Sequence, residues 1–176
     1  MADAGSTSSR PAPRPHAAHH TRAEHLVGVI SDTHGLVRPQ ALDALRGTER
    51  ILHAGDVGSP AVLEALSAIA PLTAIRGNND RDAWARDLPD TAAVEVGGVW
   101  LYVLHDVHDL DLDPRAAGFA AVVAGHSHKP GIADRNGTLF VNPGSAGPRR
   151  FTLPVAVARL HIAAGRVHGE VVVLEV

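Results

Sequence analysis

Short apolar runs alternate with helical stretches from Leu26 onward, and this alternation constrains the fold more than any other feature of the chain. Three of the runs predict buried strands: LVGVIS (26–31), RILHAGD (50–56) and LTAIRG (72–77). A helix is expected between Pro39 and Gly47, and another from Ser59-Pro60 to Pro71, with Ser59 as its cap. The order strand, helix, strand, helix, strand favours right-handed crossovers, which give a parallel sheet covered by helices.

The second half of the chain has a different pattern, with paired strands joined by tight turns. One hairpin is predicted over 91–105 with its turn at Gly97-Gly98, and another over 131–142 with its turn at Asn136-Gly137. Residues 155–176 predict a closing antiparallel pair. We therefore expect an α/β fold of two sheets, one mainly parallel and one mainly antiparallel, packed face to face with helices outside as a four-layer sandwich.

Composition sets the limits of the folded unit. Residues 1–24 are rich in Ala, Pro, Ser, Arg and His without apolar periodicity, so they are expected to form a disordered tail with solvated His16, His19 and His20. The remaining residues, 25–176, have the length of one domain, and a chain that is 45% hydrophobic can bury a sizeable core.

Charge and residue usage exclude several classes of function. The chain has no cysteine, which rules out disulfides and thiolate metal sites. No apolar stretch reaches the ~20 residues that span a bilayer, and no secretory signal is apparent, so a cytoplasmic protein without membrane contact is expected. The net charge is -3, Lys129 is the single lysine and the arginines are scattered, which argues against a general nucleic-acid surface.

Five apolar runs end in polar residues of a similar kind, and this is the main functional signal. Side chains at the carboxyl ends of neighbouring strands converge, so one crevice should hold seven candidate metal ligands: Asp32, His34, Asp56, Asn78, His105, His126 and His128. On an extended backbone, residues i and i+2 point the same way, which predicts that His126 and His128 face one side together.

Each of the seven has a structural explanation when it is taken alone. Together they would bury much polarity without a counter-charge, which costs several kcal/mol per group. The set exceeds the needs of one tetrahedral ion and suits two ions that share a carboxylate, about 3.5–4 Å apart, the arrangement used for displacement at phosphorus.

The motifs D-x-H, G-D, G-N-x-D, a strand-end His and G-H-x-H, in this order from about Leu26 to Ser145, resemble the signature of the calcineurin-like metallophosphoesterases. The short length, GNND and NPGS (142–145) are similar to the small bacterial and archaeal phosphodiesterase branch. The resemblance implies a hydrolase, a metal-dependent phosphodiesterase or phosphatase, in which a hydroxide bridging two divalent metals attacks phosphorus.

The resemblance also implies a ligand set for each ion. One ion would take Asp32, His34, Asp56 and His128, and the other Asp56, Asn78, His105 and His126, with Asp56 as the bridge. Nitrogen and oxygen ligands suit manganese, which we expect, as well as iron, zinc, nickel or cobalt.

The sequence departs from the family pattern at Asn79, where many members have a histidine that contacts the phosphoryl or leaving oxygen. Asparagine can donate a hydrogen bond but cannot supply a proton. Asn79 and Asp80 are the predicted catalytic residues beside the metals, and we expect slow action on esters with poor leaving groups unless the substrate or Asp80 provides the proton.

The fourth motif departs as well, because LHDVH has Asp106 where glycine is usual. His105 directly ends its strand and is preferred to His108 as the ligand. Asp106 either repels highly anionic substrates or points to solvent. His53 either orients a ligand or is a satisfied core histidine.

Other features leave alternatives open. The NPGS turn predicts a rigid loop, after which Arg149 or Arg150 could grip phosphate. No insertion that would form a cap separates the motifs, so we expect an open crevice for a small phosphate ester. A closing antiparallel edge could pair with a second copy as a homodimer. The rival hypothesis is a protein-assembly scaffold, because the retromer subunit of this superfamily keeps the fold without catalysis.

Overall fold

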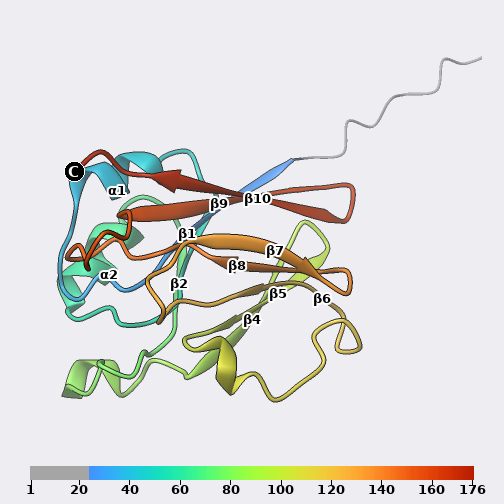
Figure 1. The fold of residues 1–176 in the computed structure, drawn as a ribbon, viewed down its shortest axis with the longest axis horizontal. Helices are drawn as coiled ribbons and strands as arrows, with labels where there is room; N and C mark the ends of the chain where they lie inside the picture. The colour runs from blue at the N-terminus through green and yellow to red at the C-terminus, as the bar shows by residue number, and fades with distance from the viewer. Residues whose placement is uncertain (1–23) are drawn as a thin grey trace, which may run out of the picture.

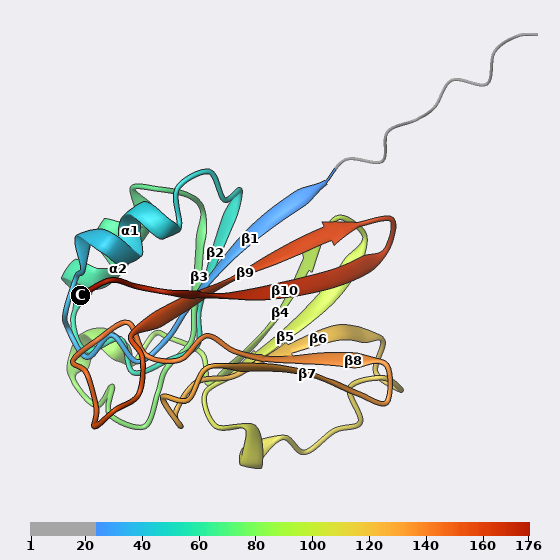
Figure 2. The same cartoon turned by 45° about the horizontal axis from the view of Figure 1, so that its top comes forward.

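The computed structural model of the protein describes residues 24–176, in which ten strands form two five-stranded sheets that lie one against the other (Figure 1, Figure 2). The predicted tail, with His16, His19 and His20, lies outside these residues except for Glu24. None of the helices in the described part of the chain is long and apolar enough to cross a membrane.

The first sheet contains the three strands expected from the amino-terminal half. Its order is β10 (Arg166–Val173), β9 (Ala156–Ala163), β1 (His25–Ile30), β2 (Arg50–His53) and β3 (Leu72–Ala74). β1, β2 and β3 are parallel, as the crossover argument predicts. The closing hairpin joins this sheet, because β9 pairs antiparallel with both β1 and β10.

The second sheet carries both predicted inner hairpins. Its order is β4 (Thr91–Val96), β5 (Val99–Leu104), β6 (Phe119–Val123), β8 (Thr138–Asn142) and β7 (Gly131–Arg135). β4 and β7 pair antiparallel with their hairpin partners, whereas β6 runs parallel to both β5 and β8. The prediction of two packed sheets is confirmed, and each sheet is mixed rather than mainly parallel or mainly antiparallel. Hydrophobic periodicity locates strands but does not say which strands pair.

The hairpin turns follow from the residues that form them. Gly97 and Gly98 have φ of 58° and 80°, and Asn136 and Gly137 have φ of 55° and 82°. Two successive positive φ angles match the right-handed twist of a hairpin, and glycine and asparagine adopt them at the lowest cost. Both turn positions predicted from the sequence are confirmed.

The main core lies between the sheets, where alternate residues of each strand point inward. Val27 and Val29 of β1 face Leu101 and Val103 of β5 in one fully buried cluster. Burying an aliphatic side chain of this size stabilises the fold by about 1.5–3 kcal/mol. The sandwich thereby holds the ends of its strands in fixed positions.

The outer faces of the two sheets are covered differently. α1 (Pro39–Ala44) and α2 (Pro60–Ser67) pack on the first sheet, as expected, although the Ser59 side chain makes no capping hydrogen bond. The second sheet is covered by the short 3-10 helix η2 (Val107–Asp109) and the residues around it, which contact Val122. A further 3-10 turn, η1 (Ala83–Ala85), follows β3.

Candidate metal centre

Seven polar side chains gather where β1, β2, β3, β5 and β6 end. They are the predicted ligands Asp32, His34, Asp56, Asn78, His105, His126 and His128. Backbone hydrogen bonds tie the loops together, since the Asp32 N–H donates to Gly55 O at 3.0 Å and the His34 N–H to Asp56 O at 2.9 Å. The loops of parallel neighbours therefore form one continuous edge.

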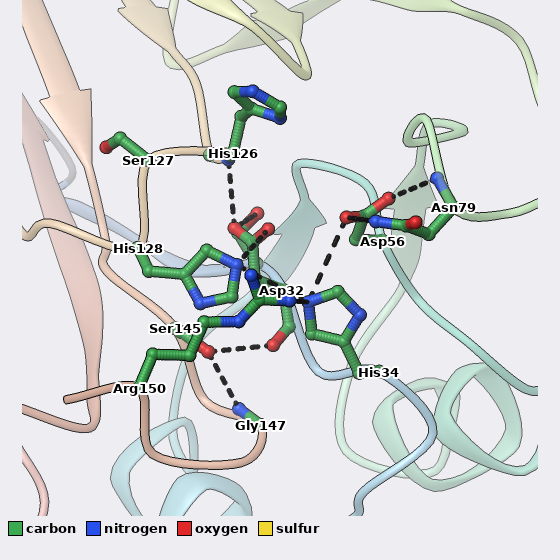
Figure 3. Close-up of polar contacts among 12 residues, drawn as sticks. Asp32, His34, Asp56, Asn79, His126, Ser127, His128, Ser145, Gly147 and Arg150 are labelled. Carbon is green, nitrogen blue, oxygen red and sulfur yellow. Dashed lines mark hydrogen bonds and ion pairs between the residues drawn. The ribbon is translucent and has the colours of Figure 1, made fainter.

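Asp32, His34 and His128 form the first half of the cluster (Figure 3). Nε2 of His128 lies 3.2 Å from Oδ1 of Asp32 and 3.4 Å from Nε2 of His34. Asp32 is fully buried and His128 is nearly so. One atom from each of the three residues lies within 4.8 Å of the others, which is the spacing of a shared cation site.

Asn78, His105 and His126 form the second half. Oδ1 of Asn78 lies 3.0 Å from Nε2 of His105 and 3.1 Å from Nδ1 of His126. The two imidazoles meet edge to face, with these nitrogens 3.4 Å apart. Three potential ligand atoms thus converge on a second point.

Asp56 lies between the two halves. Its Oδ2 is 3.9 Å from Nε2 of His34 and 3.5 Å from Nε2 of His105. Asn79 donates to Asp56 twice, from its backbone N–H at 2.8 Å and from Nδ2 at 2.6 Å. Burial raises the pKa of Asp56, but the bonds to His105 and Asn79 outweigh it and hold that pKa well below its ordinary value. Asp56 is therefore ionised at the centre of the cluster.

Two buried atoms in this cluster lack a hydrogen-bond partner, which tests whether the residues fit a metal ion. They are Nδ1 of His128 and Oδ1 of Asp32, whose 3.2 Å contact with Nε2 of His128 does not have the geometry of a hydrogen bond. A buried carboxylate oxygen without a donor is costly, and a cation beside it removes that cost. Histidine nitrogens with carboxylate and amide oxygens, without thiolate, are ligands for divalent transition metals. The donor set therefore fits a metal centre.

The orientation of His105 supports the same conclusion. Its Nδ1 donates to Ala54 O at 2.7 Å, so Nε2 faces the oxygens of Asn78 and Asp56. A bare nitrogen lone pair would be repelled there, so Nε2 needs either a proton or a metal. Burial lowers the pKa of His105, but the bonds to Asp56 and Ala54 outweigh it and raise that pKa in the metal-free protein.

The backbone of the centre is left-handed at five predicted ligands, which are Asp32, His34, Asp56, His126 and His128, with φ between 46° and 64°. The expectation of an extended backbone at the two G-H-x-H histidines is wrong. The His126 ring contacts Asn78 and the His128 ring lies beside Asp32, so the two imidazoles face different halves. Such φ angles cost non-glycine residues of order 1–3 kcal/mol each, and they persist where surrounding contacts hold them.

Asp80, predicted as a possible proton source, points into the backbone beneath the centre. Its carboxylate accepts N–H bonds from Val57 at 3.0 Å, Gly58 at 2.8 Å and Gly77 at 2.9 Å. Asp80 is only 3% exposed. This geometry favours a positioning role, because the carboxylate joins the loop that carries Asp56 to the end of β3.

His53 connects two ligand loops through Thr33. The Gly55 N–H donates to Nδ1 of His53, Nε2 of His53 lies 2.9 Å from Oγ1 of Thr33, and that hydroxyl donates to Val57 O. His53 is therefore the neutral tautomer with its proton on Nε2. Burial lowers the pKa of His53 to about 4. Of the two sequence interpretations, the positioning one has direct contacts in its favour.

The buried His53 predicts a pH dependence of stability. In the unfolded chain it takes up a proton near its ordinary pKa of about 6.5, whereas in the folded protein it does so only near pH 4. Its contribution to stability is complete above pH 6.5 and is lost as the pH falls toward 4. The free energy of unfolding of the metal-free protein should decrease by on the order of 3 kcal/mol across this range from this group.

Urea unfolding at a series of pH values would measure this change. His53→Gln should flatten the slope between pH 6.5 and 4, whereas His168→Gln on exposed β10 should leave it unchanged. An identical slope in wild type and His53→Gln would contradict the assignment.

Asp106 lies at the crevice, where it lines the cavity beside His126, and this position agrees with the first of the two expectations from sequence rather than with the second. Its Oδ1 accepts from the backbone N–H of His108 at 3.0 Å and lies 2.8 Å from Nδ1 of the same residue, and its Oδ2 is 3.5 Å from Nε2 of His126. When one ring nitrogen of a histidine binds a metal, a carboxylate beside the other ring nitrogen fixes the orientation of the imidazole. The His108 side chain is 87% exposed, so His105 rather than His108 faces the cluster.

The NPGS segment (142–145) holds two ligand loops of the centre through hydrogen bonds, a role that was not predicted from the sequence. Ser145 Oγ donates to Asp32 O at 2.9 Å, and Asn142 Nδ2 donates to Gly125 O at 2.7 Å. Ser31 Oγ also donates to Asp32 Oδ2 at 2.7 Å. The motif itself was visible in the sequence, but no local pattern links Ser145 to a residue 113 positions away.

A cavity of about 590 Å³ opens beside the second half of the centre. Asn78, His105 and His126 line its inner end, and Arg81 and Arg86 lie among the residues of its wall. Its size is that of a site for a small organic ligand.

Comparisons with known proteins agree with this geometry. The model of the calcineurin-like phosphoesterase superfamily domain matches residues 26–165. A probable metallophosphoesterase of Methanothermobacter thermautotrophicus is 33% identical over 159 residues, covering 84% of this chain and 91% of that protein.

Solved structures share the fold. A structure described as that of a novel archaeal phosphodiesterase superposes with a TM-score of 0.69 at 22% identity, covering 84% of this chain and 99% of that one. Vacuolar protein sorting 29 of Cryptosporidium parvum gives a TM-score of 0.68 at 20% identity over 85% and 97%. Since the family model covers most of the chain and the predicted motifs meet at one edge of the sandwich, the protein belongs to the calcineurin-like phosphoesterase superfamily.

Proposed function

We propose that the protein hydrolyses phosphate diesters with two divalent metal ions. The observation that carries the proposal is the position of Asp56, an ionised carboxylate between two groups of nitrogen and oxygen ligands, beside the unpartnered Oδ1 of Asp32. A carboxylate in this position is suited to bridge two cations. Family membership supports metal-dependent phosphoesterase activity, and the binuclear centre and the diester preference are our proposal.

The proposed ligands divide along the two halves described above. Asp32, His34, Asp56 and His128 would hold one ion, and Asp56, Asn78, His105 and His126 the other. When bound, the ions would supply positive charge to the phosphoryl oxygens and lower the pKa of a water molecule. We propose manganese, since the ligands are imidazole, carboxylate and amide.

The chain's own residues orient this centre. Ala54 O holds the His105 ring, Asp106 faces His126 from behind, and Asp80 fixes the Asp56 loop. Asn79 lies at the centre with its Nδ2 on Asp56, from where it can donate a hydrogen bond to substrate but no proton. Departure of the leaving group therefore depends on its own basicity.

Rates should fall steeply as the leaving group becomes more basic. Without a proton donor, negative charge develops fully on the leaving oxygen, so kcat for substituted phenyl diesters should decrease strongly with the pKa of the phenol. Asn79→His should reduce this dependence and raise the rate for poor leaving groups. A flat dependence in the wild-type protein would contradict the prediction.

The proposal is tested by measuring metal content and hydrolysis together. Metal-depleted protein is reloaded with manganese, iron, zinc, nickel or cobalt, and bound metal is compared with activity on bis(4-nitrophenyl) phosphate and 4-nitrophenyl phosphate. We expect about two ions per chain, faster diester hydrolysis and complete loss on chelation. His105→Ala should lose metal, whereas His108→Ala should retain it.

A second candidate function is a protein-assembly scaffold, because vacuolar protein sorting 29 structures are among the structural neighbours. The two candidates differ in the metal-by-substrate experiment. A chain that binds no metal at micromolar concentration and hydrolyses neither ester would favour the scaffold. The exposed edge of β10 could pair with a second copy, which light scattering would detect as a dimer.

A further inference from the structure

We propose that Arg150 binds a phosphoryl oxygen of the substrate on the His34 side of the centre. The inference rests on the proposed function, because it names a substrate contact of the same site. Arg150 extends from the loop after the NPGS segment toward the ligands, with Nη2 3.4 Å from Nε2 of His34 (Figure 3). This nitrogen of His34 is the atom that faces the cluster.

The loop that carries Arg150 is tied to the centre at its base. Nε and Nη2 of Arg38 both donate to Gly147 O, at 3.2 and 3.1 Å, and the Gly147 N–H donates to Asp32 O at 3.1 Å. Farther along, the Leu153 N–H donates to Arg150 O at 3.1 Å. The backbone of Gly147, three residues before Arg150, is therefore held next to Asp32, and the exposed Arg150 side chain extends from this anchored loop.

A turn with a left-handed first residue follows Arg150. Phe151 has φ of 52° and its side chain is exposed, so a bulky residue adopts a left-handed conformation without burial to offset the cost. The neighbouring Arg149 turns the other way, and its Nη2 donates to Val176 O at 3.3 Å. Of two adjacent arginines, one thus reaches the centre and the other reaches the carboxyl terminus.

Charge explains what Arg150 would bind. A guanidinium is always protonated, and at this position it would face metal ions of the same sign. His34 Nε2 cannot give one lone pair to both a cation and Arg150, so in the loaded protein Nη2 needs another acceptor. An anionic phosphoryl oxygen between the ions and the guanidinium satisfies both, and arginine matches phosphate geometry well.

The substrate class follows from the two sides of the site. Arg150 covers the side formed by His34 and His128, so the phosphoryl group lies between it and the ligands. The cavity of about 590 Å³ opens on the other side, beside His105 and His126, and can accept an organic substituent of the ester. We infer a substrate with one anionic phosphoryl group and an organic group that enters this cavity.

The test uses inorganic phosphate as the probe, with the full chain loaded with manganese. Isothermal titration should show phosphate affinity about 10- to 100-fold weaker in Arg150→Ala than in wild type, the range of a lost charge-assisted hydrogen bond. Arg150→Lys should restore part of the affinity. Arg149→Ala is the matched control and should bind phosphate like wild type. Metal content should be the same in all four proteins.

The same variants separate this inference from the proposed function. KM for the diester should rise at least about 10-fold in Arg150→Ala, with a smaller change in kcat. Hydrolysis and phosphate affinity that are unchanged in Arg150→Ala would overturn the inference and leave the proposed function standing. If phosphate binding depended on Arg150 but the protein hydrolysed no ester, the proposed function would be overturned and the inference about Arg150 would stand. Failure of wild type to bind phosphate, or loss of metal in Arg150→Ala, would also overturn the inference.

Discussion

Asp56→Asn should abolish metal-dependent hydrolysis, with kcat/KM reduced by about 10³-fold or more, because a bridging charge of this kind is worth several kcal/mol in the transition state. The Asp56 carboxylate lies within 4 Å of histidines from both halves of the centre. The amide keeps the shape but loses the negative charge. Bound metal should fall from about two ions per chain to one or fewer.

The metal-free variant offers an independent measurement. Asp56 is a main cause of the raised pKa of His105, so the titration of His105 followed by NMR should move to lower pH in Asp56→Asn. Asp43→Asn is the matched control, because Asp43 is exposed and pairs with Arg46 on the surface of α1. If Asp56→Asn had wild-type activity, the Asp56 carboxylate would not be required for hydrolysis and the prediction would be wrong.

Asp80→Ala should lower stability strongly even without metal. The change leaves three backbone N–H groups without an acceptor, those of the buried Val57 and Gly77 and that of the exposed Gly58. Each such group costs about 1–3 kcal/mol, less where water enters the space, so a total loss of roughly 3–6 kcal/mol is expected. For a chain of this length, that corresponds to a melting temperature lower by about 10 °C or more.

Thermal unfolding of the metal-free protein measures this effect directly. Asp80→Asn keeps one acceptor oxygen and should fall between wild type and Asp80→Ala. Asp82→Ala, two positions away and exposed, should change stability by less than about 0.5 kcal/mol. An Asp80→Ala protein that melts like wild type but loses the alkaline limb of its pH–rate profile would instead assign Asp80 as the proton donor.

Much of the fold follows from local patterns in the sequence. The apolar runs that became β1, β2 and β3 and the turns at Gly97-Gly98 and Asn136-Gly137 depend on neighbouring residues alone. Their prediction needed only periodicity and turn chemistry. The closing hairpin was also visible as two strands, but its place beside β1 was not, because pairing is a choice among distant segments.

The candidate metal centre was also predictable only in part, where it depends on local patterns in the sequence. Polar residues at strand ends predict that Asp32, His34 and Asp56 share a crevice, because neighbouring parallel strands end at one edge. The left-handed φ of these residues, and the separate directions of His126 and His128, could not be predicted. They are imposed by hydrogen bonds between loops, such as that from the His126 N–H to Asp32 Oδ2 across 94 positions.

The sequence by itself determined the strands, the turns and the set of ligand types, because each depends on residues close together in the chain. Tertiary structure decided the rest: which strands pair, that Asp80 serves the backbone, that His53 joins two loops, and that Arg150 rather than Arg149 reaches His34. These outcomes depend on contacts between distant segments: His34 and Arg150 are 116 positions apart, and His25 of β1 pairs with Ile162 of β9. Local propensity carries no information about such contacts, since burial and hydrogen-bond satisfaction are settled only when the two sheets pack.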